Sequence, residues 1–500
     1  MQLCAPNALE KYLSQGVFFI SPLLIYFDPM RKHLTTIGVL ALLIVAIASC
    51  ATSPDAEVWD DEPDAVLEPL ESELEVYQAI SLAFAMGDPE EALAAFITAE
   101  QSNPEAPETQ VLLANLHLSV GDGATAAQIL NALYQENQEN QDVIFSLALL
   151  AGARGDEEEK ERLLAEVLAL NPQWPPAQAA MGEILLRAGD TTGAQAAFEI
   201  SLQEEPQNMV ALMGLANTFL RDDKPREAEH FLNRAIEADE QYAFAWADRA
   251  QARIQLRDWF GAEADLTRAI ELDPQYPWHH IDRGRLRSRW GNPEGAVEDY
   301  SAALQLQGDQ FMTRVFRARA LEQLDRRDEA ISDYAAALSL RPDYQPARLP
   351  LAVLLFEQED FIAAAEQFDR AFQDTPRGTT RDTGLIFLSF LSRSLGGDRG
   401  GARSYLERMS SELPRTGIQA DMARYLLGPT SDQAITQAVR GETNRVLRNR
   451  YNFYLAVQYE LDRRTSTARA IYREVGEANT PGMMEPRLAA ARQQALEGNP

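Results

Sequence analysis

Histidine is the side chain that most often carries acid–base or metal chemistry at neutral pH, and this chain has only five histidines. They are His33, His117, His230, His279 and His280. The sequence contains no HExxH pair, no CxxC pair and no glycine-rich phosphate loop, so it lacks the motifs of zinc, redox and nucleotide chemistry. On a helix, the adjacent His279 and His280 would diverge by about 100° and would not readily share a metal ion. The sequence therefore predicts a protein that is not an enzyme and that holds no metal or cofactor.

Arginine is the side chain that stands out, in the segment HHIDRGRLRSRW at residues 279–290. The whole chain is acidic, with 45 Lys+Arg against 76 Asp+Glu, which argues against nucleic acid as a partner. Arginine binds carboxylates through two parallel hydrogen bonds and stacks on aromatic rings, so the segment suits an acidic or C-terminal peptide. Two interpretations stay open: these arginines bind a partner, or they pair with carboxylates of neighbouring helices.

The stretch at residues 243–276, AFAWADRAQARIQLRDWFGAEADLTRAIELDPQY, shows what kind of element positions that segment. Apolar residues recur every three to four positions on both sides of a polar turn at Arg257, which predicts two short amphipathic helices. Ala250 and Ala262 are small enough to let the two helices approach closely, and Pro274 ends the second helix. One such unit cannot bury its own apolar stripes, so we expect the chain to repeat it.

The unit does recur, from about residue 73 to 378, with a period of about 34 residues. The turn position falls on Gly87, Gly121, Gly155, Gly189, Asp223, Arg257, Gly291, Asp325 and Glu359. This order of small, bulky and proline positions resembles the tetratricopeptide repeat (TPR). The resemblance implies an all-α TPR α-α superhelical solenoid of about ten to twelve helix pairs, whose first helices form an inner concave wall.

The TPR register also assigns a candidate binding surface. The residues that it places on the concave wall are Phe244, Gln251, Trp278, Ile281, Arg285, Arg289, Met312 and Arg319. In an acidic protein these would form a local guanidinium and aromatic surface, and we predict that it contacts protein or peptide partners.

The N-terminal region predicts the compartment. Residues 30–49 have a basic start and an apolar run too short for a comfortable membrane span, as in a secretory signal peptide. The last residues of MRKHLTTIGVLALLIVAIASC resemble a bacterial lipobox, which implies that Cys50 is lipidated, palmitate included, and becomes the mature N-terminus. The alternative is a signal anchor with an incidental cysteine.

Two segments flank this signal. Residues 1–29 are predicted to be a mis-assigned start that is absent from the mature protein, although VFFISPLLIYF leaves a membrane segment open. Residues 50–70 hold three prolines and many carboxylates with little periodicity, which predicts an acidic flexible tether.

After the TPR array, assigned to residues 71–416, the pattern changes. Residues 417–482 are predicted to form a non-TPR helix pair and a degenerate TPR, and residues 483–500 a C-terminal capping helix and tail. The runs RYLLGPTSDQAITQAV, RYNFYLAVQYELDRRTSTARAIYREV and EPRLAAARQQ look like the end of the enterobacterial TPR lipoprotein named new lipoprotein I. This chain departs from that family at Ala456, where the family has glycine, and in having many more repeats.

That resemblance implies a non-catalytic adaptor that docks periplasmic proteases and peptidoglycan hydrolases and can form a homodimer. The residue after Cys50 is Ala51 rather than aspartate, which by the same resemblance favours the outer membrane, facing the periplasm. We therefore predict a lipid-anchored, non-catalytic scaffold that binds proteins or peptides of the cell envelope. The alternative is a structural assembly factor of a secretion, pilus or outer-membrane machine.

Overall fold

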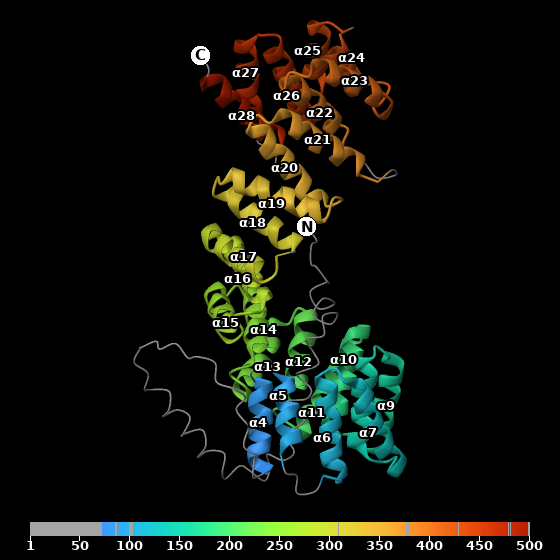
Figure 1. Cartoon of the computed structure of the whole chain (residues 1–500). Helices are drawn as coiled ribbons and strands as arrows, with labels where there is room; N and C mark the ends of the chain where they lie inside the picture. The colour runs from blue at the N-terminus through green and yellow to red at the C-terminus, as the bar shows by residue number, and fades with distance from the viewer. Residues whose placement is uncertain are drawn as a thin grey trace, which may run out of the picture. The chain divides into compact units, whose positions relative to one another are not determined.

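The described residues form helices throughout. In the computed structural model these residues are 73–85, 88–99, 104–308, 310–376, 381–428, 430–478, 480 and 482–498. They contain 25 α-helices, α4 to α28, a short 3-10 helix η3, and no strand (Figure 1). The chain divides into two compact units, Met1–Leu272 and Asp273–Pro500, so the division falls inside the array predicted for residues 71–416. The signal peptide, the tether and Cys50 lie outside the described residues.

The first unit is a series of helix pairs in which each helix packs on the next one along the chain (Figure 1). Its helices are α4 (Glu73–Ala85), α5 (Pro89–Thr98), α6 (Pro107–Ser119), α7 (Gly123–Glu136), α8 (Gln141–Ala153), α9 (Glu157–Leu170), α10 (Pro175–Ala188), α11 (Thr191–Glu204), α12 (Met209–Arg221), α13 (Pro225–Ala238), α14 (Ala243–Gln255) and α15 (Trp259–Leu272).

The second unit continues with the same kind of pair and then departs from it. Its helices are α16 (Pro277–Trp290), α17 (Pro293–Leu306), α18 (Phe311–Gln323), α19 (Arg327–Leu340), α20 (Gln345–Glu357), α21 (Phe361–Gln373), α22 (Gly384–Leu395), α23 (Arg399–Met409), η3 (Ser410–Glu412), α24 (Ile418–Leu427), α25 (Asp432–Gly441), α26 (Arg445–Leu461), α27 (Thr465–Gly476) and α28 (Glu485–Gly498).

The turn inside eight successive pairs, from α6–α7 to α20–α21, has one recurring backbone geometry. Eight turn residues, one from each of eight successive repeats, have a φ between 56° and 88°, the left-handed region: Gly121, Gly155, Gly189, Asp223, Arg257, Gly291, Asp325 and Glu359. In several pairs the next residue is an Asp or Asn that caps the second helix; Asp258, for example, accepts a hydrogen bond from the backbone N–H of Gly261 at 3.0 Å. The left-handed residue ends the first helix and the cap begins the second, so the turn has the same length each time.

Small residues set how closely the two helices of a pair approach. Ala262, Ala296 and Ala330, one from each of three successive second helices, are fully buried. In the α16–α17 pair, Gly284 lies directly under the ring of Tyr300, and a Cβ atom at residue 284 would stand 2.7 Å from Tyr300 Cε1. Helix α16 therefore lies close against α17, which fixes the position of the arginine-rich segment.

The C-terminal helices fold back onto earlier first helices of their own unit. Helix α26 packs on α22, where the rings of Tyr454 and Phe387 lie 5.4 Å apart, and Phe453 of α26 reaches Phe356 of α20. Helix α28 packs on α27 and also on α20, with Leu488 buried in the core. The sequence predicted α28 as a cap on the last pair; the structure adds its contact with α20, much earlier in the chain.

The left-handed turns generate a stability prediction. Arg257 has a φ of 64° and an exposed side chain, so we expect Arg257→Gly to stabilise the first unit by about 0.5 to 1 kcal/mol, because glycine adopts this geometry without a Cβ clash. Gly291→Ala is the opposite control: φ is 88° and a Cβ would meet nothing within 4 Å, so the cost of about 1 kcal/mol is one of backbone alone. Urea unfolding measures both, and a destabilised Arg257→Gly would contradict the prediction.

Candidate functional site

The four arginines of α16 occupy two faces of the helix. Arg283 and Arg287 point toward α17, where their guanidinium groups lie 2.7 Å and 3.0 Å from the carboxylate oxygens of Asp299. The Asp299 side chain is 2% exposed, and each arginine is less than 20% exposed. Arg285 and Arg289 are exposed, one helical turn apart and on a different face. Arg283 and Arg287 thus pair with a carboxylate of the neighbouring helix, as one interpretation of the sequence has it, and binding of a partner by Arg285 and Arg289 stays a prediction.

Asp299 is held charged inside the helix pair. Burial alone would raise the pKa of its carboxyl group, but the neighbouring His280 and Arg283 outweigh burial and the net pKa is lowered. A carboxylate that accepts hydrogen bonds from two guanidinium groups is compensated in the interior, where a lone charge would be costly. The arrangement therefore orients α16 on α17 and has no obvious part in chemistry.

The same ion pair recurs one repeat earlier and one repeat later along the sequence. Arg317 of α18 donates two hydrogen bonds to Asp333 of α19, at 2.7 and 2.8 Å. In the first unit, Arg249 and Arg253 both reach Asp265, at 2.7 and 2.8 Å. We did not predict these specific pairs from the sequence, although an Arg and an Asp 16 residues apart recur in three successive repeats.

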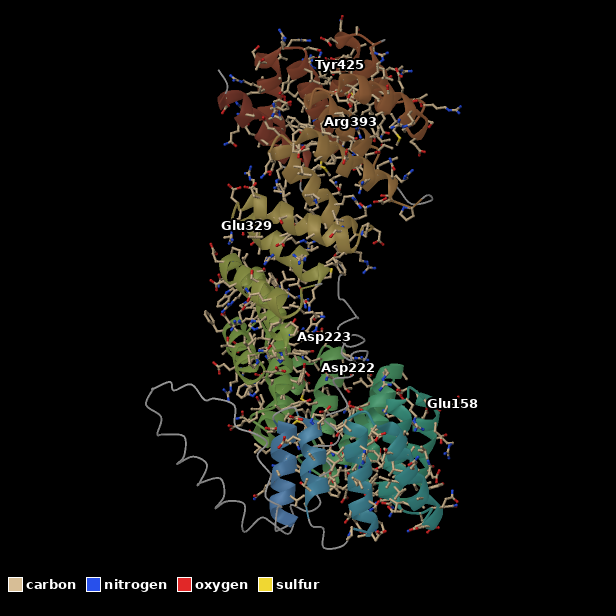
Figure 2. All side chains as sticks on the ribbon, in the orientation of Figure 1. Glu158, Asp222, Asp223, Glu329, Arg393 and Tyr425 are labelled. Carbon is tan, nitrogen blue, oxygen red and sulfur yellow. The ribbon has the colours of Figure 1, made fainter. Side chains whose placement is uncertain are left out.

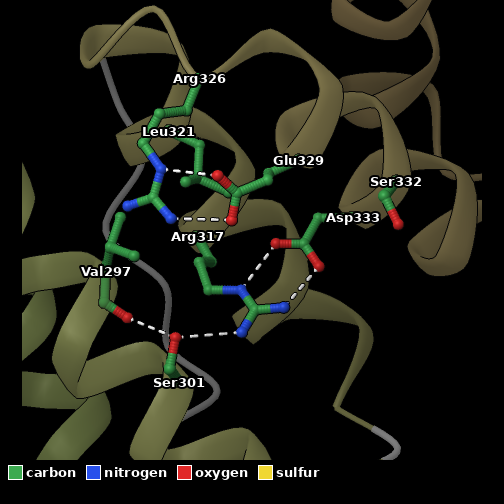
Figure 3. A pocket seen from close by; sticks show the side chains of 8 residues that line it. All are labelled: Val297, Ser301, Arg317, Leu321, Arg326, Glu329, Ser332 and Asp333. Carbon is green, nitrogen blue, oxygen red and sulfur yellow. Dashed lines mark hydrogen bonds and ion pairs between the residues drawn. The ribbon is translucent and has the colours of Figure 1, made fainter.

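A small pocket of about 200 Å³ lies beside the Arg317–Asp333 pair, between α17, α18 and α19 (Figure 3). It is lined by Val297, Ser301, Arg317, Leu321, Arg326, Glu329, Ser332 and Asp333. Its charged groups pair with one another: Arg326 binds Glu329 through two hydrogen bonds of 2.7 Å, and Arg317 also donates to the Ser301 hydroxyl at 3.0 Å. The pocket thus contains two arginines matched by two carboxylates and offers no excess charge to a ligand.

Comparisons with known proteins agree with the helix pairs. Family models described as "Tetratricopeptide repeat" match residues 77–141, 185–254 and 316–378. The described residues are thus all-α, and both units contain tetratricopeptide repeats. A search of curated proteins finds no match.

Solved TPR structures resemble parts of the chain. YrrB, described as a TPR protein with an unusual peptide-binding site, is 19% identical, with 40% of this chain and 98% of that chain covered and a TM-score of 0.33. The TPR protein TTC0263 of Thermus thermophilus is 26% identical over 36% of this chain and 97% of its own, with a TM-score of 0.30. PilW, described as a widely conserved type IV pilus biogenesis factor, is 17% identical over 42% and 96%, with a TM-score of 0.32.

The predicted wall residues on α16 and α18, in the second compact unit of the chain, differ in accessibility. Arg285, Arg289 and Arg319 are exposed, and Trp278 and Met312 are half-buried. The prediction that Ile281 offers a contact to a partner is corrected. Its side chain is 2% exposed because it belongs to the same buried cluster as Val315 of the next first helix.

Arg285 and Arg319 stand at the same TPR register position in successive repeats, on α16 and α18. The Arg285 guanidinium lies over the ring of Phe316, 5.8 Å from its centroid, so the two helices contribute to one surface. Phe316 is half-buried, and the TPR register did not assign it to the wall because it stands one position away from the wall positions. Binding of a partner by this surface stays a prediction.

The predicted wall residues of the first unit are on α14. Phe244 is half-buried with its ring 5.7 Å from that of Tyr242, and Gln251 is exposed. Charged side chains cover the helices of this unit and of the second one, as the labelled Glu158, Asp222, Asp223, Glu329 and Arg393 illustrate (Figure 2). Of the two predicted wall residues on α14, Gln251 is thus accessible and Phe244 is partly accessible.

The histidines lie in ordinary structural settings. His117 Nδ1 is 3.2 Å from Asp122, and the ring of His230 packs edge-on against Phe231. In the described part of the chain, no three His, Cys, Asp or Glu side chains are arranged to hold a metal ion. Within the same residues, no helix is both long enough and apolar enough to cross a membrane.

The two arginine faces generate a stability test. We expect Arg283→Ala to destabilise the second unit by about 3 kcal/mol, because it removes half of the compensation of a buried carboxylate. Arg285→Ala should change stability by less than about 0.5 kcal/mol, because an exposed arginine contributes little. Urea unfolding followed by tryptophan fluorescence compares the two. Equal losses in both variants would show that the exposed arginines are structural as well.

His279 generates a pH prediction. Its ring is fully buried, 4.8 Å from the ring of Tyr276, and burial, with a smaller contribution from His280, lowers its pKa from 6.5 to about 4. Between these values the unfolded chain binds a proton that the folded chain does not, so stability falls as pH drops from about 6.5 to 4, by about 3 kcal/mol in total.

The measurement for His279 is urea unfolding at pH 7 and pH 4.5, in the wild type and in His279→Leu. Carboxylates also weaken the fold in acid, so the difference between the two proteins isolates the histidine. The wild type should lose more stability than the variant, and parallel losses would refute a neutral, buried His279.

Proposed function

We propose that this protein is a lipid-anchored, non-catalytic TPR scaffold that holds protein partners in the cell envelope. The observation that carries the proposal is the accessible surface of α16 and α18, where Arg285, Arg289 and Arg319 are exposed beside half-buried Met312 and Phe316. Arginine and aromatic residues are enriched at the centres of protein interfaces. TPR repeats generally serve as rigid surfaces for protein recognition, and a curved wall of packed helices binds without large rearrangement.

The cellular part of the proposal depends on the sequence. The lipobox-like end of residues 30–50 supports lipidation of Cys50, and the acidic stretch after it supports a tether between the membrane and the helices. Peptidoglycan hydrolases and proteases of the periplasm are the partner classes that the resemblance to new lipoprotein I suggests. In this role the protein makes and breaks no bonds, and specificity comes from the side chains of successive first helices.

The test uses the full chain expressed in a bacterium that processes lipoproteins. We expect the wild type to incorporate a palmitate analogue and to fractionate with the outer membrane, and Cys50→Ala to lose the label and leave that fraction. In vivo cross-linking followed by mass spectrometry should recover the same small set of envelope proteins in repeated experiments.

Two outcomes would contradict the proposal. An unlabelled wild type would remove the lipid anchor. A cross-linked set no different from that of an untagged strain would remove the scaffold role. Recovery of secretion or pilus components in place of hydrolases or proteases would favour the assembly-factor alternative.

A further inference from the structure

The two first helices at the start of the second unit carry an excess of arginine. Together α16 and α18 contain seven arginines and only two carboxylates, Asp282 and Glu322. Four of the seven are turned toward the buried Asp299 and Asp333: Arg283, Arg287, Arg314 and Arg317. The remaining three, Arg285, Arg289 and Arg319, are exposed. We call these three, with Met312 and Phe316, the arginine face.

The two carboxylates on these helices do little to neutralise the arginine face. Asp282 is 3.3 Å from Arg285, in a contact between neighbouring turns of one helix that leaves the arginine side chain 57% exposed. Glu322 is already engaged, since it accepts hydrogen bonds from the Tyr334 hydroxyl at 2.7 Å and from Arg487 at 2.8 Å. The three exposed guanidinium groups of the face therefore outnumber the carboxylates that α16 and α18 themselves carry.

The arginine face does not extend to α20, the next first helix, because α28 packs on α20. On α20, Val353 and Phe356 are buried, and the Glu357 side chain is 5% exposed. Arg487 of α28 donates to Glu357 at 2.9 Å while it also binds Glu322, so α28 spans the edge between α18 and α20. A ligand on the arginine face thus meets two accessible first helices of this unit and then α28, which favours a short segment.

We propose that the arginine face binds a short, acidic, extended segment of a partner protein, with α28 closing one end of the site. The inference rests on the proposed scaffold function and names the chemistry of its ligand. Arg285 and Arg319 share a register position on neighbouring helices, so a chain crossing both helices can pair one carboxylate with each.

The distance between α16 and α18 determines how far apart the acidic residues of the ligand stand. Packed helices lie about 10 Å apart, and an extended chain advances about 3.3 Å per residue. Because successive side chains of an extended chain point to opposite faces, the two carboxylates must stand an even number of residues apart, and about four residues are needed to reach both helices. An apolar residue between them faces Phe316 and Met312.

The test measures fluorescence anisotropy of a labelled short peptide with two glutamates spaced about four residues apart and a phenylalanine midway between them, so that all three side chains share one face of an extended chain. Its controls are the same peptide with glutamine for glutamate and a polyphosphate of equal charge. We expect the wild-type protein to bind the acidic peptide at low salt and to lose affinity as NaCl rises, because exposed ion pairs are screened. The double variant Arg285→Ala/Arg319→Ala should bind about tenfold more weakly.

Arg403→Ala is the matched variant, since it removes one exposed arginine from α23, far along the same unit, where the side chain is 61% exposed. It should bind the peptide like the wild type, and circular dichroism should show all variants equally folded. The proposal is overturned if the double variant binds like the wild type, if Arg403→Ala is equally impaired, or if the glutamine peptide or polyphosphate binds as tightly. If the peptide-binding test fails in one of these ways but envelope proteins are still cross-linked, the proposal of an acidic ligand is wrong and the proposed scaffold function is retained.

Discussion

Asp299 is the constraint on which the arginine-rich helix depends. Its carboxylate is 2% exposed and accepts hydrogen bonds from Arg283 and Arg287, one helical turn apart on α16. Compensating this buried charge fixes the rotation of α16 about its axis. That rotation turns Arg283 and Arg287 inward and leaves Arg285 and Arg289 accessible. A helix that would look uniformly basic in isolation thus acquires a face that pairs with α17 and an accessible face.

The repeat architecture could be predicted because it depends on local periodicity. The regular spacing of turn residues and buried alanines is visible in the sequence, and each repeat contacts mainly its neighbours, so no long-range information is needed. The register also identified the exposed Arg285 and Arg319. It did not show that Ile281 is buried, because burial at that position depends on how closely Val315 of the next pair approaches.

Two features of the structure could not be predicted from the period of the repeats: the contacts of α28 with α20 and the division of the chain into two units. The contacts of α28 with α20 join residues 130 positions apart, Arg487 and Glu357, and such a fold-back has no periodic signal. The sequence also gives no sign of the division after Leu272, because the spacing of the repeats is the same on both sides of it. The Arg–Asp pairs within the repeats could have been predicted from the sequence. Doing so requires the repeat and also the observation that an Arg and an Asp recur 16 residues apart within it.

Because α26 and α28 pack on α20, the gain or loss of a helix pair has different consequences on the two sides of α16. Duplication or loss of a helix pair before α16 would alter the length of the array and leave the arginine face and its closed end intact. The same event between α18 and α28 would separate Arg487 from Glu322 and Glu357 and expose the apolar residues of α20. Natural variation in repeat number should therefore concentrate on the N-terminal side, while the segment from α16 to α28 is inherited as a block.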